Sequence, residues 1–432
     1  MLQSETVRKY DTYKDSGIEW IGKVPHEWNV LPHKYIMSKV KNICEKYDGE
    51  DIISLTMKGV IKRDLDNPMG KMPLTFDGYQ RIETGNLLLC LFDIDVTPRC
   101  VGLIKDDGLT SPAYSQFKFL GQDCPQYYTY LLTMIDDDKC FLHLAKNLRS
   151  SLTEDNFGAI LTIQPPFEEQ QQIADYLDKK CEDIDKVVET EKSVIEKLKE
   201  YKQSIITEAV TKGLGKSVPL KDSGIEWIGK IPQHWDVLSL ARIANIVRGA
   251  SPRPAGDPMY FCGNFCPWIT VAEVTKDDSK YIFETEEYLT ELGVQHSKLI
   301  DENTFLLSNS GATLGVPKIT KIKGCINDGS LAFLDISCNM DYLYYVLKSR
   351  TNEFRKQMQG YGQPNLNTTI VKAFKICLPS TNEQIRIAEY LDKKCSEIDK
   401  AIANNEQVIE KFTEYKKSLI YECVTGKRKV VK

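Results

Sequence analysis

One long stretch of this chain is written twice, and this repeat limits the possible folds more than any other feature. The nine residues IADYLDKKC at 173–181 return as IAEYLDKKC at 387–395, an offset of 214 residues. A repeat of this length does not arise by chance. The chain therefore contains two copies of one element, and the remaining segments must fold around both.

Both copies carry apolar residues at the spacing of a coiled coil. Read in sevens, two positions of each copy are occupied by leucine, isoleucine, valine, alanine or cysteine almost throughout, which predicts a helix with an apolar seam. The larger seam residues are Leu177, Ile184, Val188, Ile195, Leu198 and Ile205 in the first copy and Leu391, Ile398, Ile402, Ile409, Phe412 and Leu419 in the second.

Polar residues interrupt the two seams at the same places. Glu191 and Lys202 in the first copy correspond to Asn405 and Lys416 in the second. Polar seam residues cost stability but fix register and pairing, so the two helices are expected to pair with each other or with a shared partner. No Gly or Pro interrupts 168–212 or 382–425, and helices of this length are ~67 Å long at ~1.5 Å per residue. A spacer or scaffold is favoured over a helix that merely packs in a globular core.

The composition is that of a soluble globular protein with two or three domains. The 432 residues are 42% hydrophobic and 27% charged, with a net charge of −5. This charge argues against a protein that coats nucleic acid without sequence preference, although local basic surfaces remain compatible with it. The 13 Cys have no paired spacing, which indicates reduced thiols and a cytoplasmic location. Neither an export signal nor a membrane-spanning run is present in the sequence.

A second repeat precedes each helical copy by a long interval. The sequence DSGIEWIGK at 15–23 returns at 222–230, and each copy is followed by Pro and Trp. We call these two segments the hooks; their large apolar side chains are Trp20, Trp28, Trp227 and Trp235. The tryptophans are expected to pack on the domain bodies or helix ends, with contact to a partner subunit as the alternative. Each hook also matches G-x-x-x-x-G-K, but Val24 or Ile231 follows where a phosphate loop needs Ser or Thr, and Pro comes next, so nucleotide binding is not expected.

The order of these features predicts two mixed modules in a tandem repeat. We expect the first hook at 1–28, a module at 29–167, a long helix at 168–212, a linker with the second hook at 213–236, a module at 237–381, a long helix at 382–425 and a basic tail at 426–432. The modules mix strand-like and helix-like patterns, so the fold class is α/β or α+β. Their ends are alike while their beginnings and middles differ. This pattern indicates the same kind of task performed on different targets.

The sequence contains no arrangement that predicts catalysis or metal binding. The five His are scattered, and Cys262 and Cys266 lack a second pair at zinc spacing. The run QPPF at 164–167 is similar to the corner with which amino-methyltransferases hold a flipped base. The second copy has LPST at 378–381 instead, and no Gly-rich turn accompanies either, so we interpret the run as the exit from a strand into the long helix.

Polar and basic residues in the Gly- and Pro-rich connections of both modules give the stronger functional signal. Arg, Lys, Asn and Gln read base edges, while Ser, Thr and Lys contact phosphates, although any single one can simply be a solvated surface residue. The candidates are Lys58, Lys62, Arg63, Lys71, Arg99, Lys146, Asn147 and Arg149 in the first module and Arg248, Arg253, Asn309, Ser310, Thr313, Arg350, Arg355, Lys356, Gln363 and Asn365 in the second.

The hooks, the pairs Glu169-Gln170 and Glu383-Gln384 at the helix starts, the repeated IAxYLDKKC cores and SPAY at 111–114 together resemble the specificity subunits of type I restriction-modification systems. The likeness covers nearly the whole chain. It implies two target-recognition domains that each read half of a bipartite DNA site, joined by two long helices that pair antiparallel. The second module departs from the family at SPAY, where DGSLAF at 328–333 takes its place.

The resemblance also implies the partners and cofactors. The chain is expected to bind double-stranded DNA and two methyltransferase subunits that modify adenine N6, with restriction/translocase subunits joining for cleavage. It is expected to hold no cofactor itself; S-adenosylmethionine and ATP with Mg²⁺ belong to the partner subunits. Two other functions remain open from the residues: a coiled-coil adaptor that does not bind DNA, and a self-sufficient methyltransferase that binds S-adenosylmethionine. In the favoured function the helices act as a ruler for the unread gap between half-sites.

Overall fold

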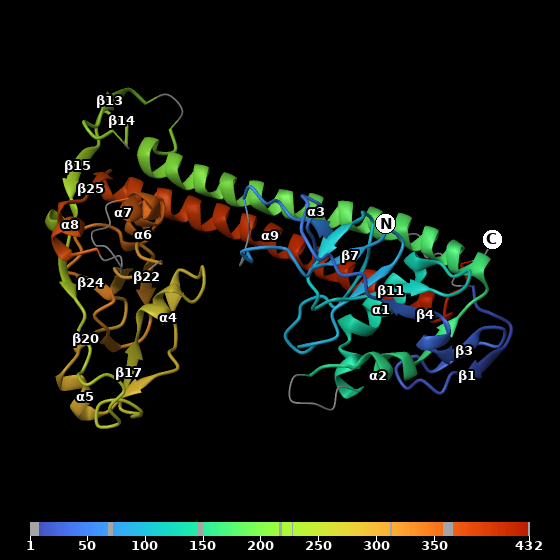
Figure 1. Cartoon of the computed structure of the whole chain (residues 1–432). Coiled ribbons are helices and arrows are strands. Elements are labelled where there is room, and N and C mark those ends of the chain that lie inside the picture. The colour runs from blue at the N-terminus through green and yellow to red at the C-terminus, as the bar shows by residue number, and fades with distance from the viewer. Residues whose placement is uncertain are drawn as a thin grey trace. The chain divides into compact units, whose positions relative to one another are not determined.

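The computed structural model describes residues 8–67, 72–144, 150–215, 218–226, 228–311, 313–356 and 366–430. The chain divides into two compact units. Unit 1 is Met1–Lys192 together with Glu406–Lys432, and unit 2 is Ser193–Asn405. Each unit therefore combines one module with one segment of each long helix (Figure 1).

The two long helices predicted from the heptads are present as α3 (Phe167–Lys212) and α9 (Thr381–Val424). Each starts after a strand and a two-residue connection that contains proline, Pro165-Pro166 before α3 and Pro379 before α9. At the start of α3 the Gln170 side-chain N–H donates to the carbonyl of Pro165 over 2.9 Å, and at the start of α9 Gln384 donates to Pro379 over 2.8 Å. The run at 164–167 is thus the strand-to-helix exit that the sequence predicted.

Within each unit the two helix segments pair antiparallel. In unit 1 the beginning of α3, with Leu177 and Ile184, shares an apolar cluster with Leu419 near the end of α9. In unit 2 the end of α3, with Ile206, shares a cluster with Leu391 near the beginning of α9. Each unit thus joins the start of one helix to the end of the other, the antiparallel pairing that the resemblance implied, and the seams meet each other as one of their two alternatives predicted.

The seam lysines form the same ion pair in both units. Lys416 of α9 lies 2.7 Å from Asp185 of α3, and Lys202 of α3 lies 2.6 Å from Asp399 of α9. These two pairs are related by the 214-residue offset of the repeat. A lysine at a seam position therefore bends its ammonium to the rim, where the facing helix supplies a carboxylate.

The module of unit 1 is built on a four-stranded antiparallel sheet in the order β4-β11-β8-β9. Its strands are β4 (Met37–Val40), β11 (Ser115–Phe119), β8 (Leu87–Leu89) and β9 (Val101–Leu103). Two smaller pairs extend it: the hairpin β5 (Ile53–Thr56) and β6 (Gly59–Lys62), and the pair β7 (Gln80–Ile82) and β10 (Gly108–Thr110). The helices of the module are α1 (Pro125–Asp137), the 3₁₀ turn η2 (Cys140–Leu144) and α2 (Glu154–Ala159).

Unit 2 repeats this frame and adds a second sheet. Its main sheet has the order β16-β24-β21-β22-β18, so the first four strands take the positions of β4, β11, β8 and β9. These strands are β16 (Asn245–Arg248), β24 (Ser330–Leu334), β21 (Phe305–Ser308), β22 (Pro317–Thr320) and β18 (Tyr281–Ile282). The second sheet, β19-β17-β23-β20, comprises β19 (Tyr288–Leu289), β17 (Cys266–Ile269), β23 (Gly324–Ile326) and β20 (Lys298–Ile300). The helices are α4 (Val271–Thr275), α5 (Glu291–Gln295), α6 (Met340–Lys348), α7 (Thr351–Lys356) and α8 (Thr368–Ala373).

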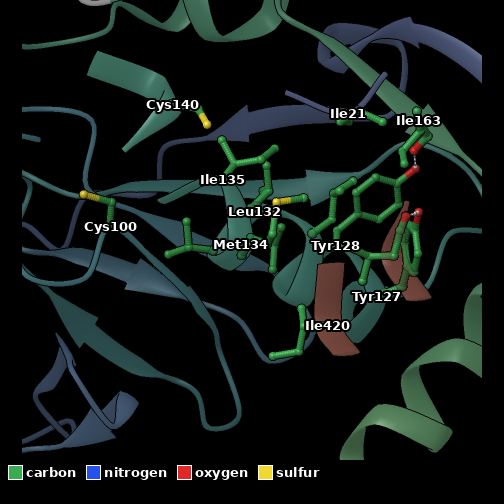
Figure 2. Close-up of a cluster of buried hydrophobic side chains, with 14 of the residues drawn as sticks. Ile21, Cys100, Tyr127, Tyr128, Leu132, Met134, Ile135, Cys140, Ile163 and Ile420 are labelled. Atoms are coloured by element: carbon green, nitrogen blue, oxygen red, sulfur yellow. Dashed lines mark hydrogen bonds between the residues drawn. The ribbon is translucent and has the colours of Figure 1, made fainter. Parts of the chain in front are cut away.

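A tyrosine-rich helix joins each module to the long helices. In unit 1 the Tyr127 hydroxyl of α1 donates to the carbonyl of Val424 in α9 over 2.8 Å. In unit 2 the Tyr342 hydroxyl of α6 lies 3.4 Å from the carbonyl of Val210 in α3 and 2.9 Å from that of Cys377 in β25. Figure 2 shows the cluster around α1 in unit 1, where side chains of α1 lie among Ile21 of the hook, Ile163 and Ile420 of α9. The modules are therefore anchored to the helix pair by buried side chains.

Each hook is a short antiparallel hairpin, which accounts for the failed phosphate-loop match. The first pairs β1 (Tyr13–Asp15) with β2 (Lys23–Pro25), and the second pairs β13 (Leu220–Asp222) with β14 (Lys230–Pro232). Gly17 and Gly22 adopt φ of 69° and 68°, a conformation that favours glycine, so these glycines serve the turn. A strand follows the Lys in each copy, whereas a phosphate loop needs a helix there.

The strand that follows each hook pairs with the strand that precedes each long helix. In unit 1, β3 (Asn29–Pro32) pairs with β12 (Leu161–Gln164), and in unit 2, β15 (Asp236–Ser239) pairs with β25 (Lys375–Leu378). Short 3₁₀ turns follow these strands, η1 (His33–Tyr35) and η3 (Leu240–Arg242). The two units are therefore alike at both ends of each module, including the beginnings that the repeat pattern predicted to differ, and they differ in the middle.

The basic tail packs on unit 1 through residue 430. The Lys427 ammonium donates to the carbonyl of Ile21 over 3.0 Å, and the Lys429 backbone N–H donates to the carbonyl of Arg8 over 2.8 Å. The Tyr13 hydroxyl also donates to the carbonyl of Gly426 over 3.1 Å. A frayed, solvated end would have been the default for such a sequence, and the described part of the tail differs from it.

Candidate nucleic-acid interface

The hook tryptophans that the structure describes are packed against their own units. Trp28 and Trp235 are buried, and the Trp28 indole N–H donates to the Glu169 carboxylate of α3 over 3.0 Å. Trp20 is half-buried in the same cluster. Trp227 lies outside the described residues. For Trp28 and Trp235 the packing alternative therefore holds.

The predicted seam residues lie along the inner faces of α3 and α9. Leu177, Ile184, Ile195, Leu391, Ile398 and Leu419 are buried. Val188, Leu198, Ile205, Ile402, Ile409 and Phe412 are half-buried. Their partial exposure follows from a two-helix pair, which cannot enclose both sides of its seam.

In unit 1 the structure gathers three basic candidates on one hairpin. Lys58 stands in the turn between β5 and β6, Lys62 is on β6, and Arg63 follows it. The turn is exposed, and Met57 beside Lys58 is 61% exposed. Lys62 lies 2.6 Å from Asp51. Among the described residues of unit 2 no strand pair corresponds to this hairpin, so it belongs to the part of the module that differs between the halves.

Arg99, the other unit 1 candidate that the structure describes, does not join this hairpin. Arg99 is mostly covered and lies 2.9 Å from Asp137 and 4.0 Å from the buried Asp136. It stabilises the C-terminal end of α1, where these two carboxylates lie, and is therefore a structural side chain. Lys71, Lys146, Asn147 and Arg149 lie outside the described residues.

In unit 2 four candidates surround the turn between β23 and β24. Arg248 ends β16, and Arg253 follows it in an exposed loop. Asn309 is buried, and its backbone N–H donates to the carbonyl of Gly329 in the turn over 2.9 Å. Ser310 follows Asn309, and a Cβ added at Gly329 would lie 2.9 Å from its Oγ. The four candidates come from two separate segments of sequence, and the turn is a third.

Asp328 lies at the centre of this group and was not among the predicted site residues. The Ser251 hydroxyl donates to its carboxylate over 2.5 Å, and a guanidinium nitrogen of Arg253 lies 3.6 Å from the same carboxylate. The one available signal was the replacement of SPAY by DGSLAF at this turn. That signal marked the turn at which the two modules differ. It did not reveal that Asp328 contacts Arg248 through its backbone carbonyl and Arg253 through its carboxylate.

One predicted contact residue of unit 2 is buried. Arg350 is 5% exposed, lies directly after α6 and has its guanidinium 3.9 Å from Glu353. Burial lowers the pKa of Arg350. A buried arginine beside a core helix cannot contact a DNA surface. The sequence reasoning counted it because it stands near other polar residues, which says nothing about burial.

Two other unit 2 candidates have described side chains. Thr313 is exposed after β21, and Arg355 is half-buried in α7. Gln363 and Asn365 lie outside the described residues, as does the side chain of Lys356.

A hollow of about 510 Å³ beside α6 is a joint between the module of unit 2 and its helix pair. Lys280 lies there, 2.7 Å from Asp341 and 2.9 Å from Asp392 of α9. Burial alone would lower the pKa of Lys280, but its bonds to these carboxylates outweigh burial and raise it. Three tyrosine rings lie within 5.5 Å of its ammonium. The charges are matched within the protein, so the hollow serves attachment.

The described residues contain no group of three or more His, Cys, Asp or Glu placed to hold a metal ion. Among the same residues, no helix is long and apolar enough to cross a membrane.

Comparison with known proteins shows which family this chain is similar to. Residues 232–411 match the family model described as the type I restriction modification DNA specificity domain. The type I restriction enzyme MjaVIII specificity subunit of Methanocaldococcus jannaschii is 28% identical over 62% of this chain. The MjaIX specificity subunit of the same organism is 31% identical over 38% of this chain. Residues 232–411 carry the DNA specificity domain of type I restriction-modification systems. The resemblance seen in the hooks and helices is confirmed.

The matches to these two specificity subunits span less than two thirds of their own length, 61% and 38%. Solved structures extend the likeness of fold to nearly the whole chain. A chain from a study of complex assembly and conformational transition in the type I R-M system has a TM-score of 0.72 at 14% identity, covering 93% of this chain and 98% of that one. The HsdS subunit from Thermoanaerobacter tengcongensis has a TM-score of 0.51 at 16% identity, with the same coverage of both chains.

Proposed function

We propose that this specificity subunit reads a bipartite site in double-stranded DNA, with one module on each half. The observation that carries the proposal is the contrast between frame and middle. The two modules share a sheet order, yet unit 1 presents the β5–β6 hairpin where unit 2 presents arginines around the β23–β24 turn. Different side chains on one frame suit two different half-sites.

Replacement of one module tests this division. Exchanging residues 29–166 for the corresponding segment of another specificity subunit should change one half of the recognised sequence and leave the other intact. The readout is adenine methylation mapped across a genome in the presence of the methyltransferase partner. Alteration of both halves would contradict independent modules.

The adaptor alternative makes a different prediction. A scaffold without DNA-reading modules would show no preference among bipartite sequences, with or without the methyltransferase partner. A self-sufficient methyltransferase would bind S-adenosylmethionine as an isolated chain. Gel shifts on site-containing and scrambled duplexes, together with calorimetry on S-adenosylmethionine, separate these functions.

The repeated surface supports the docking of two copies of one methyltransferase. Glu19 and Lys23 in the first hook are exposed and return as the exposed Glu226 and Lys230 in the second. Exposed side chains are not required by the core, and the module middles have diverged. Retention of these exposed identities is therefore expected if the same partner meets both hooks.

Stoichiometry tests the docking. Glu19→Lys or Glu226→Lys should each remove one methyltransferase copy from the complex, and the double variant should remove both, since a reversed charge repels the partner's matching group. Native mass spectrometry counts the copies. The control is Glu182→Lys, an exposed α3 residue that is replaced by Ser396 in the second copy. Two copies bound to the double variant would exclude the hooks as docking surfaces.

A further inference from the structure

The turn between β23 and β24 in unit 2 brings one aspartate, Asp328, to two exposed arginines, one at its backbone carbonyl and one at its carboxylate. Arg248 donates from Nε to the backbone carbonyl of Asp328 over 2.7 Å. The Asp328 carboxylate accepts from the Ser251 hydroxyl over 2.5 Å and lies 3.6 Å from a terminal nitrogen of Arg253. One residue thus contacts both arginines of the loop and the serine between them.

The backbone holds the arginine loop tightly against this turn. The Gly249 N–H donates to the carbonyl of Ser330 over 3.0 Å, and the Ala250 N–H donates to the carbonyl of Ile326 over 3.1 Å. A Cβ at Gly249 would lie 2.1 Å from the backbone oxygen of Asn327, so only glycine permits this approach. The loop therefore starts from a fixed position. The Asp328 carboxylate then sets the orientation of Arg253, while its backbone carbonyl holds Arg248.

We propose that Asp328 is a positioning residue whose carboxylate orients Arg253, beside the Arg248 that its backbone carbonyl holds, toward the bases of one half-site, most directly a guanine edge. The proposal rests on the proposed function of DNA reading. An arginine reads guanine through two parallel N–H bonds to O6 and N7, which requires a set orientation of the guanidinium fork. Arg253 is 70% exposed and would otherwise sample many rotamers.

The charge of Asp328 distinguishes positioning from simple attraction. A carboxylate beside Arg253 reduces the positive potential that draws a protein to phosphates, so its presence weakens binding to arbitrary DNA. Its contribution therefore lies in selectivity. Removing the charge should raise affinity for DNA that lacks the site while lowering discrimination within the site, and a merely structural role does not produce this pair of opposite effects.

In unit 1 the corresponding turn is held by an amide side chain and not by a carboxylate. The turn at 111–114 before β11 is held by the buried Gln80 amide, which donates to the carbonyl of Ser111 over 3.1 Å and to that of Tyr114 over 2.6 Å. No arginine is paired with a carboxylate at that turn among the residues that the structure describes. The proposed role of Asp328 thus concerns the half-site read by unit 2 alone.

The test uses Asp328→Asn in the full chain bound to its methyltransferase partner. Bound duplexes are selected from a library randomised in both half-sites and sequenced. We expect base preference at guanine positions of the unit 2 half-site to fall about tenfold, with the unit 1 half-site unchanged. Affinity for duplexes without the site should rise, with a steeper dependence on salt.

Glu302→Gln is the matched control, since it removes one exposed carboxylate from a loop of the same unit away from the arginines. It should leave preference at both half-sites unchanged. If the wild-type protein selects a site and a folded Asp328→Asn variant selects it equally well, the role of Asp328 is overturned. Absence of any preference in the wild type overturns DNA reading itself. If Asp328→Asn does not fold, Ser251→Ala, which removes one bond to the carboxylate and no charge, takes its place, and unchanged preference there is equally contrary.

Discussion

His33 and Leu240 take equivalent positions in the two units and differ in what they can titrate. Both residues are buried. Each backbone N–H donates to the carbonyl of the residue just before the strand that precedes the long helix, His33 to Ile160 over 3.0 Å and Leu240 to Phe374 over 2.8 Å. The His33 ring stacks on Phe157 with centroids 4.6 Å apart. Burial lowers the pKa of His33 to about 4. Unit 1 therefore holds a neutral imidazole where unit 2 holds an aliphatic side chain.

This difference predicts that unit 1 loses stability in acid. An unfolded histidine has a pKa of about 6.5, so the unfolded state takes up a proton first as pH falls. The stabilisation is complete above about 6.5 and is lost as pH falls toward 4, by on the order of 3 kcal/mol. His33→Leu, which copies unit 2, should flatten that dependence in urea titrations, whereas the exposed His26→Gln should not. A steep acid dependence that persists in His33→Leu would assign it to other groups.

Burial is the property of single residues that the sequence predicted least well. Arg350 and Arg253 both stand in polar surroundings in the sequence, yet one lies in the interior and the other is exposed. Asp328 gained its importance from Arg248 and Ser251, which lie far from it in sequence. Such contacts depend on how the strands of unit 2 pair, and no local pattern records them.

At the scale of elements, the ion pairs between α3 and α9 give a measurable prediction. The Lys202 side chain is 14% exposed and that of Asp399 is 54% exposed, so water screens the pair only in part. A double-mutant cycle with Lys202→Met and Asp399→Asn should give a coupling of about 0.5–1 kcal/mol in unfolding free energy. The exposed pair Lys394 and Glu397 within α9 is the control and should couple less strongly. Equal couplings would mean that pairing across the helices adds nothing.

The long helices were predictable because their signal is local and repeated. Each heptad restates the position of Leu177, Ile184 and their equivalents, so errors at one residue do not matter. The sheets of the modules were not predictable in the same way. Strands of two to five residues such as β18 or β17 carry too little pattern, and β17 finds its parallel partner β23 far along the chain.

At the scale of the whole molecule, both helices run unbroken across the boundary between the units. If they act as a ruler, their length sets the preferred gap between half-sites. Inserting one heptad into each helix keeps the seam in register and adds ~10 Å, about three base pairs. Selection from a library with randomised gaps should show the longer spacing. An unchanged gap would end the ruler hypothesis.

The division of the chain into units has a consequence for its synthesis. Unit 1 begins at the N-terminus, yet its core contains Leu419, Ile420, Cys423 and Val424. Synthesis must therefore reach residues 419–424 before the core of unit 1 can be completed, while unit 2 needs nothing beyond residue 405. Nascent chains usually mature from the front; here the half translated first must wait for the final turns of α9.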